Sequence, residues 1–489
     1  TNNADSGFPK PIIGETFYSI KDGNWSDISV WQTASGRVGL TPSSNDNVYV
    51  RHIITLNIST SCNSLYILGT LLFDSTARGL SIFGDLHCAT IGVLNMSTSN
   101  AAHSLGLYGI NNDFFGTFIT GTSSNVTYAR NGNQNVLPLQ YRNLVLTGSG
   151  VKYLIADTTI NGGLTCNSGG FLECSIYNLS VFGGTSVPNS SANGIGKNGS
   201  GNLLFVGGIA IGNSTTPTLL LTGNPNVECR GGITFDVGGN ITVGSGTWTF
   251  STNNQTLSLQ GRALNNAIIS GAITVSVNNT LSIYGNINCD NASGKLLMNA
   301  SSILAFTTQI AAETSLTIGT WDFTTNANTI QYNGNYSATI PSYFTTFSSL
   351  TIGGTGTKTL GVNTTLNANL NNNGTLECST YNLTVNGQAL INPNSSFSKN
   401  SSGNFLFVGE LTLGSSGGGG QAITFNLSGN PTVECRGGIQ VPSATPTLFN
   451  SGTNTWTFST NNQNIYNING SGSGMSLVFT CPILISGAI

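Results

Sequence analysis

Charged residues are scarce in this chain of 489 residues. Lysine and arginine together number 15, aspartate and glutamate number 18, and the formal net charge at pH 7 is −3. The basic residues are scattered and form no basic stripe of the kind that neutralises nucleic-acid phosphates. The composition therefore argues against nucleic acid as a partner.

Groups that carry acid–base chemistry are also few. The 11 Asp and 7 Glu are spread along the chain, and the three histidines, His52, His87 and His103, lie in its first quarter. Cleavage of a polysaccharide needs clustered carboxylates, or carboxylates beside Arg or Lys. We predict a non-enzymatic protein without catalytic, cofactor-binding or metal-binding residues.

The nine cysteines form no CxxC pair and no zinc-type spacing. Six of them occupy apolar positions of expected strands, which favours small core residues stacked inside the fold. Two alternatives stay open. One is disulfides between neighbouring coils, with Cys166 and Cys174 nearest in sequence, and the other is metal ligation.

Long apolar runs are missing as well. No stretch approaches the roughly 18 apolar residues that cross a membrane, so we expect no membrane span. The opening TNNADSGFPKPIIGE has neither the basic start nor the apolar core of a signal peptide. We interpret the chain as the mature form of an exported protein, extracellular or on the cell surface. The alternative is a chain that never carried a signal peptide.

Glycine and asparagine are abundant instead, with 63 and 62 residues, and 38% of the chain is hydrophobic. A short word recurs: Gly, any residue, Leu or Ile, any residue, then an apolar residue or Cys, as in GTLLF from Gly69. Alternation with period two predicts a short strand with one buried face, and the glycine supplies a corner. We therefore predict an all-β parallel β-helix (β-solenoid), right-handed or a close relative. The residues expected to point inward are Leu71, Phe73, Leu164, Ile233, Phe235, Leu376 and Ile439.

A long internal duplication runs through the chain, with an offset of about 206 residues. FLECSIYNLSV from Phe171 returns as TLECSTYNLTV from Thr375, and GNPNVECRGGI from Gly223 returns as GNPTVECRGGI from Gly429. Self-similarity of this kind indicates a repeat architecture. We predict an N-terminal cap over 1–60, first coils over 61–119, one long copy over 120–324, and a second, incomplete copy over 325–489.

The N-terminal segment has a distinctive order of aromatic and polar positions: Trp25, Trp31, Pro42, Asp46–Val50 and His52. This order resembles the opening of secreted G8-like β-helix repeat proteins of Bacteroidota. A later group is similar to strand repeats of the same proteins and of fibre proteins of their phages: Tyr332, Pro341, Tyr343 and Leu350–Leu360. The resemblance implies a surface scaffold or adhesin, or alternatively a virion fibre, and no common catalytic residues.

The clearest polar motif is Glu228-Cys-Arg230, which returns as Glu434-Cys-Arg436. On a strand, Glu and Arg project to one side and Cys to the other. We interpret each motif as a surface ion pair, worth at most about 1 kcal/mol. A charged pair that faces a sugar ligand is the alternative.

Two further features bear on carbohydrate. The alternation Trp-x-Phe at Trp248, Trp321 and Trp456 places Trp and Phe on one face, so we expect buried stacking between coils, with stacking on sugar rings as the alternative. Candidate glycosylation sequons begin with Asn24, Asn57, Asn95 and Asn125. In a chain this rich in Asn, Ser and Thr, their excess over chance is small.

The leading functional interpretation is an extracellular structural or adhesive protein, and a filament subunit in one form of it. The alternatives are a phage fibre or tailspike that binds a host receptor, and a β-helix protein that binds or degrades polysaccharide. The sequence stops at ISGAI, from Ile485 to Ile489, where the earlier copy continues into more strand. We expect either a longer polypeptide or head-to-tail self-association, because an uncovered strand edge is a template for another strand.

Overall fold

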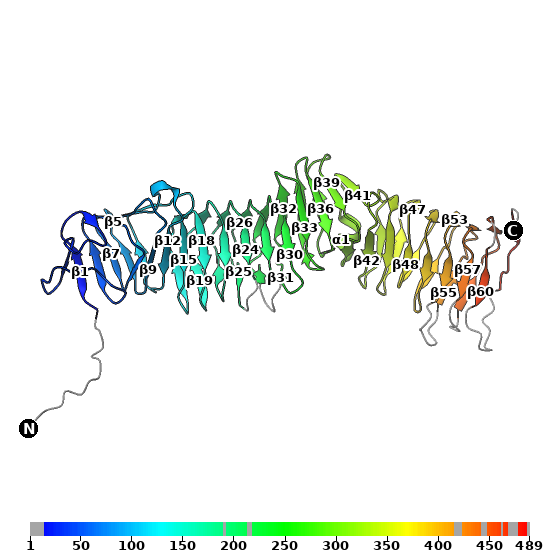
Figure 1. Ribbon diagram of the computed structural model, residues 1–489. Coiled ribbons are helices and arrows are strands. Elements are labelled where there is room, and N and C mark those ends of the chain that lie inside the picture. The colour runs from blue at the N-terminus through cyan, green and yellow to red at the C-terminus, as the bar shows by residue number, and fades with distance from the viewer. Residues whose placement is uncertain are drawn as a thin grey trace, which may run out of the picture. The chain divides into compact units, whose positions relative to one another are not determined.

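The computed structural model describes residues 14–188, 192–212, 218–414, 423–441, 447–460, 463–467 and 478–486. These residues are nearly all β, and their short parallel strands stack into the coils of a β-solenoid (Figure 1). The predicted fold class is confirmed. Two compact units divide between Gly246 and Thr247, inside the first of the two long copies.

Among the parallel strands of the first unit, neighbours in a sheet differ by three in chain order, so a coil contributes strands to three sheets at a time. Two of these sheets end at β13 (Asp113–Phe114) and β14 (Thr117–Ile119), and two new ones begin at β16 (Gln134–Val136) and β17 (Gln140–Tyr141). One of these sheets contains, in spatial order, β6 (Thr60–Cys62), β9 (Gly79–Ile82), β12 (Ser104–Leu107), β15 (Asn125–Tyr128), β18 (Asn143–Leu146), β21 (Leu164–Cys166), β24 (Thr185–Val187), β27 (Ile209–Ile211) and β30 (Ile233–Phe235). The pairing is parallel throughout this list.

The first coil of this unit is covered by an antiparallel strand. That coil belongs to a second sheet, whose parallel strands are β1 (Thr16–Ser19), β4 (Asn47–Val50), β7 (Leu65–Ile67), β10 (Leu86–Cys88) and β13 (Asp113–Phe114). At the edge of this sheet, β3 (Trp31–Thr33) pairs with β1 in the opposite direction. Trp25 and Trp31 are fully buried here, with ring centroids 5.1 Å apart. The indole N–H of Trp31 donates to the Trp25 carbonyl at 2.9 Å. Parallel coil pairing therefore begins at β1, within the segment 1–60.

The alternation of the recurring word sets the core. All seven residues predicted to point inward are buried, whereas Thr234, between Ile233 and Phe235, is exposed. Equivalent strands also pair in the same register within each of the two copies. Leu203 of β26 (Asn202–Phe205) lies opposite Val227 of β29 (Asn226–Cys229). Phe405 of β53 (Asn404–Phe407) lies opposite Val433 of β56 (Thr432–Cys435) in the same way.

Glycine makes the corner before β30 possible. Gly232 has φ +85°, a left-handed backbone conformation that residues other than glycine rarely adopt. Gly438, its equivalent in the second copy, also has φ +85°. A Cβ on Gly231 would lie 2.3 Å from the backbone nitrogen of Gly208 in the previous coil. The pair of glycines in the word CRGGI is thus required by both the turn and the close approach of two coils.

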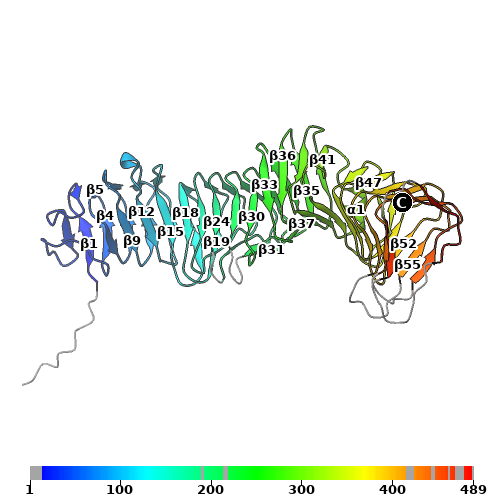
Figure 2. The same ribbon diagram turned by 45° about the vertical axis from the view of Figure 1, so that its right-hand side comes forward.

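The second unit, residues 247–489, has one sheet that runs through it and others that are interrupted. The continuous sheet contains β34 (Ala263–Leu264), β37 (Thr280–Ile283), β40 (Ile303–Phe306), β42 (Thr329–Tyr332), β45 (Ser349–Ile352), β48 (Leu370–Asn372), β51 (Ala389–Ile391), β54 (Leu411–Leu413), β57 (Ile439–Val441) and β60 (Ile465–Asn467). Beside it, strands of later coils also lie in parallel, as β52 (Ser396–Ser398) and β55 (Ile423–Asn426) do (Figure 2).

A break interrupts the other two sheets of the second unit near α1 (Gln309–Thr314). One sheet ends at β38 (Ile287–Cys289) and another ends at β41 (Thr320–Asp322). New sheets start at β43 (Ala338–Ile340) and β44 (Thr346–Phe347). The N-cap Thr308 accepts a hydrogen bond from the Ala311 N–H, and Ala311 and Ala312 bury one face of the helix. The helix therefore occupies a position where the coils before and after it carry strand.

Candidate functional site

The repeated charged motif forms the ion pair that its spacing predicts. The Nε of Arg230 lies 2.7 Å from Oε1 of Glu228, and the Nε of Arg436 lies 2.7 Å from Oε1 of Glu434. All four side chains are about one-third exposed, while Cys229 and Cys435 between them are buried. Hydrogen bonds from Arg436 and Ser459 hold the pKa of Glu434 below its ordinary value. Each carboxylate near the end of a strand thus binds the guanidinium that directly follows that strand.

Replacing Glu434 by Gln is expected to lower the free energy of unfolding by less than about 1 kcal/mol at pH 7, because the pair is open to solvent. The depressed pKa adds stability above the ordinary value of 4.5, and this stability is lost as the pH falls. Urea denaturation of Glu434→Gln, with Glu228→Gln as the matched variant of the first copy, measures the effect. A loss above about 2 kcal/mol would contradict a surface role.

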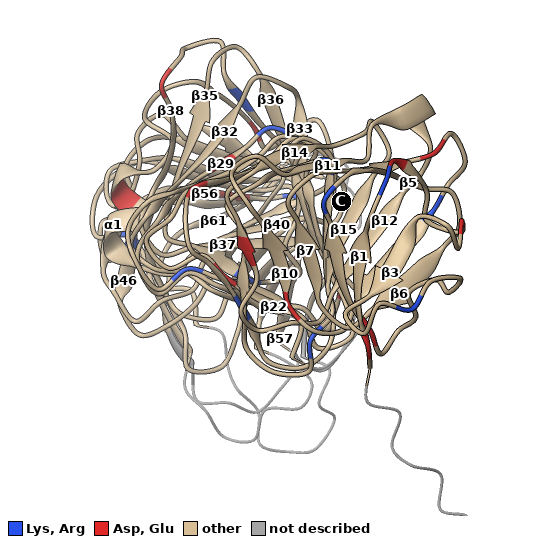
Figure 3. Cartoon of the chain, turned by 90° about the vertical axis from the view of Figure 1, so that its left-hand side faces the viewer, with Lys and Arg blue, Asp and Glu red and all other residues tan. Residues whose placement is uncertain are grey.

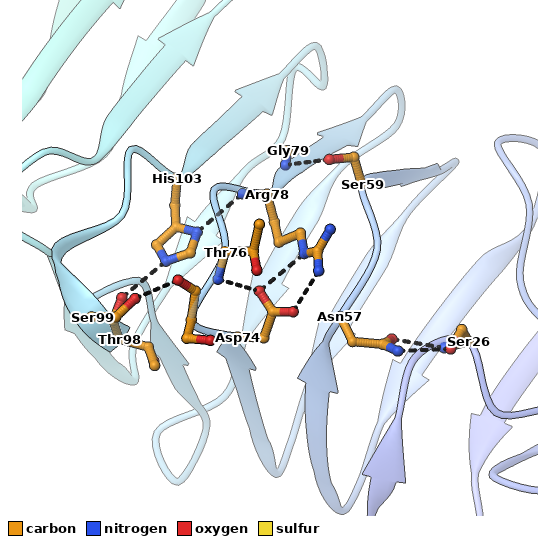
Figure 4. Close-up of polar contacts among 11 residues, drawn as sticks. Ser26, Asn57, Ser59, Asp74, Thr76, Arg78, Gly79, Thr98, Ser99 and His103 are labelled. Carbon is orange, nitrogen blue, oxygen red and sulfur yellow. Dashed lines mark hydrogen bonds and ion pairs between the residues drawn. The ribbon is translucent and has the colours of Figure 1, made fainter.

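A second polar cluster ties the corners of neighbouring coils (Figure 4). Arg78 donates to both carboxylate oxygens of Asp74, at 2.9 and 2.7 Å, and these hydrogen bonds hold the pKa of Asp74 below its ordinary value. The backbone N–H of Arg78 donates to Nδ1 of His103, whose Nε2 lies 3.2 Å from the Thr98 carbonyl. His103 is completely buried, and both of its ring nitrogens lie within hydrogen-bond distance of backbone groups. Each group in this cluster has a structural partner.

His52 lies in the corner between β4 and β5 (Ile53–Leu56), and His87 lies on β10. His52 Nδ1 lies 3.0 Å from the hydroxyl oxygen of Ser19. His87 bonds to Asp113 at 2.9 Å and stacks on Tyr66 at a centroid distance of 4.7 Å. Tyr66 continues the stack to Tyr49 at 4.3 Å. Because the ring faces cover one another, this row of aromatic residues offers ring edges to solvent.

The cysteines are free thiols, and all except Cys481 are buried. The structure therefore supports the interpretation as core residues over disulfides, including one between Cys166 and Cys174. Burial raises the pKa of the Cys88 and Cys289 thiols to about 11, and the other buried thiols are shifted in the same direction. Thiols in this state are poor nucleophiles and poor metal ligands at neutral pH.

Four completely buried lysines are the feature that sequence reasoning missed: Lys152, Lys197, Lys358 and Lys399. Lys358 lies at an inward position of β46 (Thr357–Leu360), where the alternation leads one to expect an apolar side chain. Its ammonium donates to the carbonyls of Gly334, Tyr336 and Gly356, at 3.1, 2.5 and 2.9 Å. The lysine thereby joins its own coil to the corner of the preceding coil. Burial lowers the pKa of Lys358 to about 8.

The same arrangement recurs in the other copy. Lys152, on β19 (Val151–Leu154), donates to the carbonyls of Arg130, Gly132 and Ser149, at 2.8, 3.0 and 3.1 Å. Lys197 and Lys399 each bind two carbonyls of a preceding corner. The offsets of these two lysine pairs, 206 and 202 residues, match the duplication. Retention of four of only seven lysines between the copies was the available sequence signal.

The three tryptophans of the Trp-x-Phe words do not all behave alike. Trp248 and Trp456 are buried, as expected. Trp321 is only half-buried, which corrects the expectation, although Phe323 two residues later is buried. Trp321 lies on β41, the last strand of its sheet, and therefore lacks a following strand to cover it. It lines a cavity of about 420 Å³ together with Tyr343 and several threonines.

The candidate glycosylation residues all reach the surface. Asn24 is exposed, and Asn57, Asn95 and Asn125 are half-buried. The Asn57 amide donates to the Ser26 hydroxyl at 2.8 Å, so attachment at Asn57 would have to break this contact (Figure 4). The side-chain oxygen of Asn95 accepts from both the N–H and the hydroxyl of Ser97.

Over the described residues, charged groups occur singly or in small pairs rather than as a stripe (Figure 3). The same residues contain no group of three or more His, Cys, Asp or Glu placed to hold a metal ion. None of their helices has the length and apolar character to cross a membrane. Ile489 lies outside the described residues.

Comparisons with family models, curated proteins and solved structures find no match to this chain. The resemblance to G8-like repeat proteins and phage fibres therefore stays a prediction from the quoted residues.

Proposed function

We propose that the chain is a non-enzymatic extracellular structural or adhesive protein whose solenoid supplies a stable surface. The observation that carries this proposal is that many of the chain's Lys, His and Cys side chains are buried inside the solenoid. The four buried lysines bind corner carbonyls, His103 bonds to two backbone groups, and eight cysteines are buried. A catalytic group must reach its substrate. The buried lysines and His103 bind backbone groups instead, and the buried cysteines lie in the core.

The experiment that tests the proposal is a search for turnover. We expect the purified chain to release no new reducing ends and no unsaturated uronates from pectin, alginate, xylan or cellulose, beyond a heat-denatured control. Sustained release above that control would overturn the non-enzymatic assignment. Mass photometry on the same sample separates the remaining forms. Monomers or open polymers favour the scaffold, and a closed trimer favours the virion fibre.

A further inference from the structure

The cavity beside Trp321 lies where two sheets of the second unit are interrupted. Its walls come from the segment after α1, from β41, and from the segment that leads into β44. In uninterrupted regions a strand of the next coil continues each sheet and covers the side chains of the strand before it. At this break β41 pairs only with β39 (Lys295–Met298) among the described strands, and the cavity lies between β41 and the segment that leads into β44.

The lining combines aromatic surface with hydroxyl groups. Trp321 is half-buried and Tyr343 is 42% exposed. The Tyr343 hydroxyl donates to the Ser315 carbonyl at 2.6 Å, and its ring packs edge-on against the buried Phe344 at 4.8 Å. These contacts hold the Tyr343 ring in a fixed position. Five threonines complete the polar part of the lining: Thr317, Thr320, Thr324, Thr345 and Thr346.

The charge of the site is as informative as its shape. Every residue that lines the cavity is uncharged at neutral pH. The neighbouring carboxylate of Asp322 is outside the lining and is bound by Lys295 at 2.8 Å. Burial opposes ionisation of Asp322, but hydrogen bonds from Lys295 and Thr325 outweigh it and hold its pKa below the ordinary value. An ionic ligand would therefore find no counter-charge among the lining residues.

We propose that this cavity binds a sugar residue of a neutral glycan, with the pyranose ring against Trp321. The volume of about 420 Å³ lies in the range of small-molecule sites, about 300–1,000 Å³. The face of an aromatic ring carries partial negative charge and attracts the C–H groups of a pyranose face. Threonine hydroxyls both donate and accept hydrogen bonds, which suits a ligand with several hydroxyl groups. A flat apolar ligand could not form hydrogen bonds with those hydroxyls.

This inference deepens the adhesive form of the proposed function and rests on it. It differs from the row of Tyr49, Tyr66 and His87, whose faces are already stacked on one another. It also differs from Trp248 and Trp456, which are buried in the core. Among the three Trp-x-Phe words, only that of Trp321 leaves its indole accessible.

The test is isothermal titration of the full chain with cellohexaose, mannohexaose, chitohexaose and, as an acidic probe, hexagalacturonate at millimolar concentrations. We expect one of the three neutral hexasaccharides to bind, and Trp321→Ala to weaken that binding at least tenfold. Trp321→Tyr should restore part of it, because the variant keeps a ring. Tyr284→Ala is the matched control, since Tyr284 is 51% exposed in the same unit but lies outside the cavity lining.

Absence of binding by all three neutral hexasaccharides would overturn the inference, and so would a Trp321→Ala chain that binds as well as the parent. Preference for hexagalacturonate would overturn the neutral assignment. Thermal unfolding of each variant shows whether a loss of binding reflects a loss of structure. If Trp321→Ala is unfolded, the binding of Trp321→Tyr is the result that supports or overturns the inference. None of these failures touches the structural role, which is tested separately by turnover and stoichiometry.

Discussion

Substituting Ile233 by Asp is expected to unfold at least the coils around β30, with a loss of about 5 kcal/mol in the stability of that region. Ile233 is 1% exposed and lies between Ile209 of the previous coil and the corner formed by Gly231 and Gly232. An unpaired carboxylate buried among apolar side chains is among the costliest single changes. Each coil contacts mainly its neighbours, so unfolding should begin locally.

Thr234→Asp is the control for this prediction, because Thr234 is the next residue on the same strand and is exposed. It should unfold within about 0.5 kcal/mol of the parent chain, as surface substitutions generally do. Hydrogen exchange followed by mass spectrometry would locate the loss of protection in the variant. If Ile233→Asp melts like the parent, the inward register of β30 is wrong.

Lys358→Met is expected to lower the free energy of unfolding at pH 7 by about 3 kcal/mol. The methionine fills most of the volume, but it cannot donate to the carbonyls of Gly334, Tyr336 and Gly356. Each buried acceptor left without a donor costs about 1–3 kcal/mol, and only part of this is recovered by removing a buried charge. Lys152→Met, the equivalent change in the first copy, should have a similar effect. Lys21→Met is the control, because Lys21 is exposed.

The effect of Lys358→Met should also depend on pH. The folded amine has a pKa of about 8 against an ordinary value of 10.5, so between these values the unfolded chain binds the proton more tightly. The parent therefore gains stability relative to the variant as pH rises through this window, by about 2 kcal/mol from pH 7 to pH 9.5. The comparison between two chains cancels the other titrating groups. A difference that stays constant, or shrinks, would contradict burial of a charged amine at pH 7.

The inward positions of the recurring word could be predicted because the alternation is local. Ile233 and Phe235 point inward and Thr234 outward for the same reason that any strand alternates its side chains. The partner of Glu434 was equally local, because Arg436 is two residues away, directly after β56, and side chains two apart on extended backbone lie on one face. The alternation failed at Lys358 and Lys152, where an inward position holds an amine. Three carbonyls from two coils make that position suitable for a cation, and no pattern within one coil reveals them.

The sequence by itself determined the all-β solenoid, its repeated word and its duplication, because period-two alternation and corner glycines are properties of short segments. Only the tertiary structure decided what lies across the coils. It placed the ammonium of Lys358 against carbonyls up to 24 residues away, and it ended a sheet at β41 so that Trp321 stayed accessible while Trp248 and Trp456 did not. The physical reason is that hydrogen bonding and burial in a solenoid act between neighbouring coils. The environment of a side chain therefore depends on the coil stacked above or below it. The residues of a single strand do not predict where that stacking is interrupted.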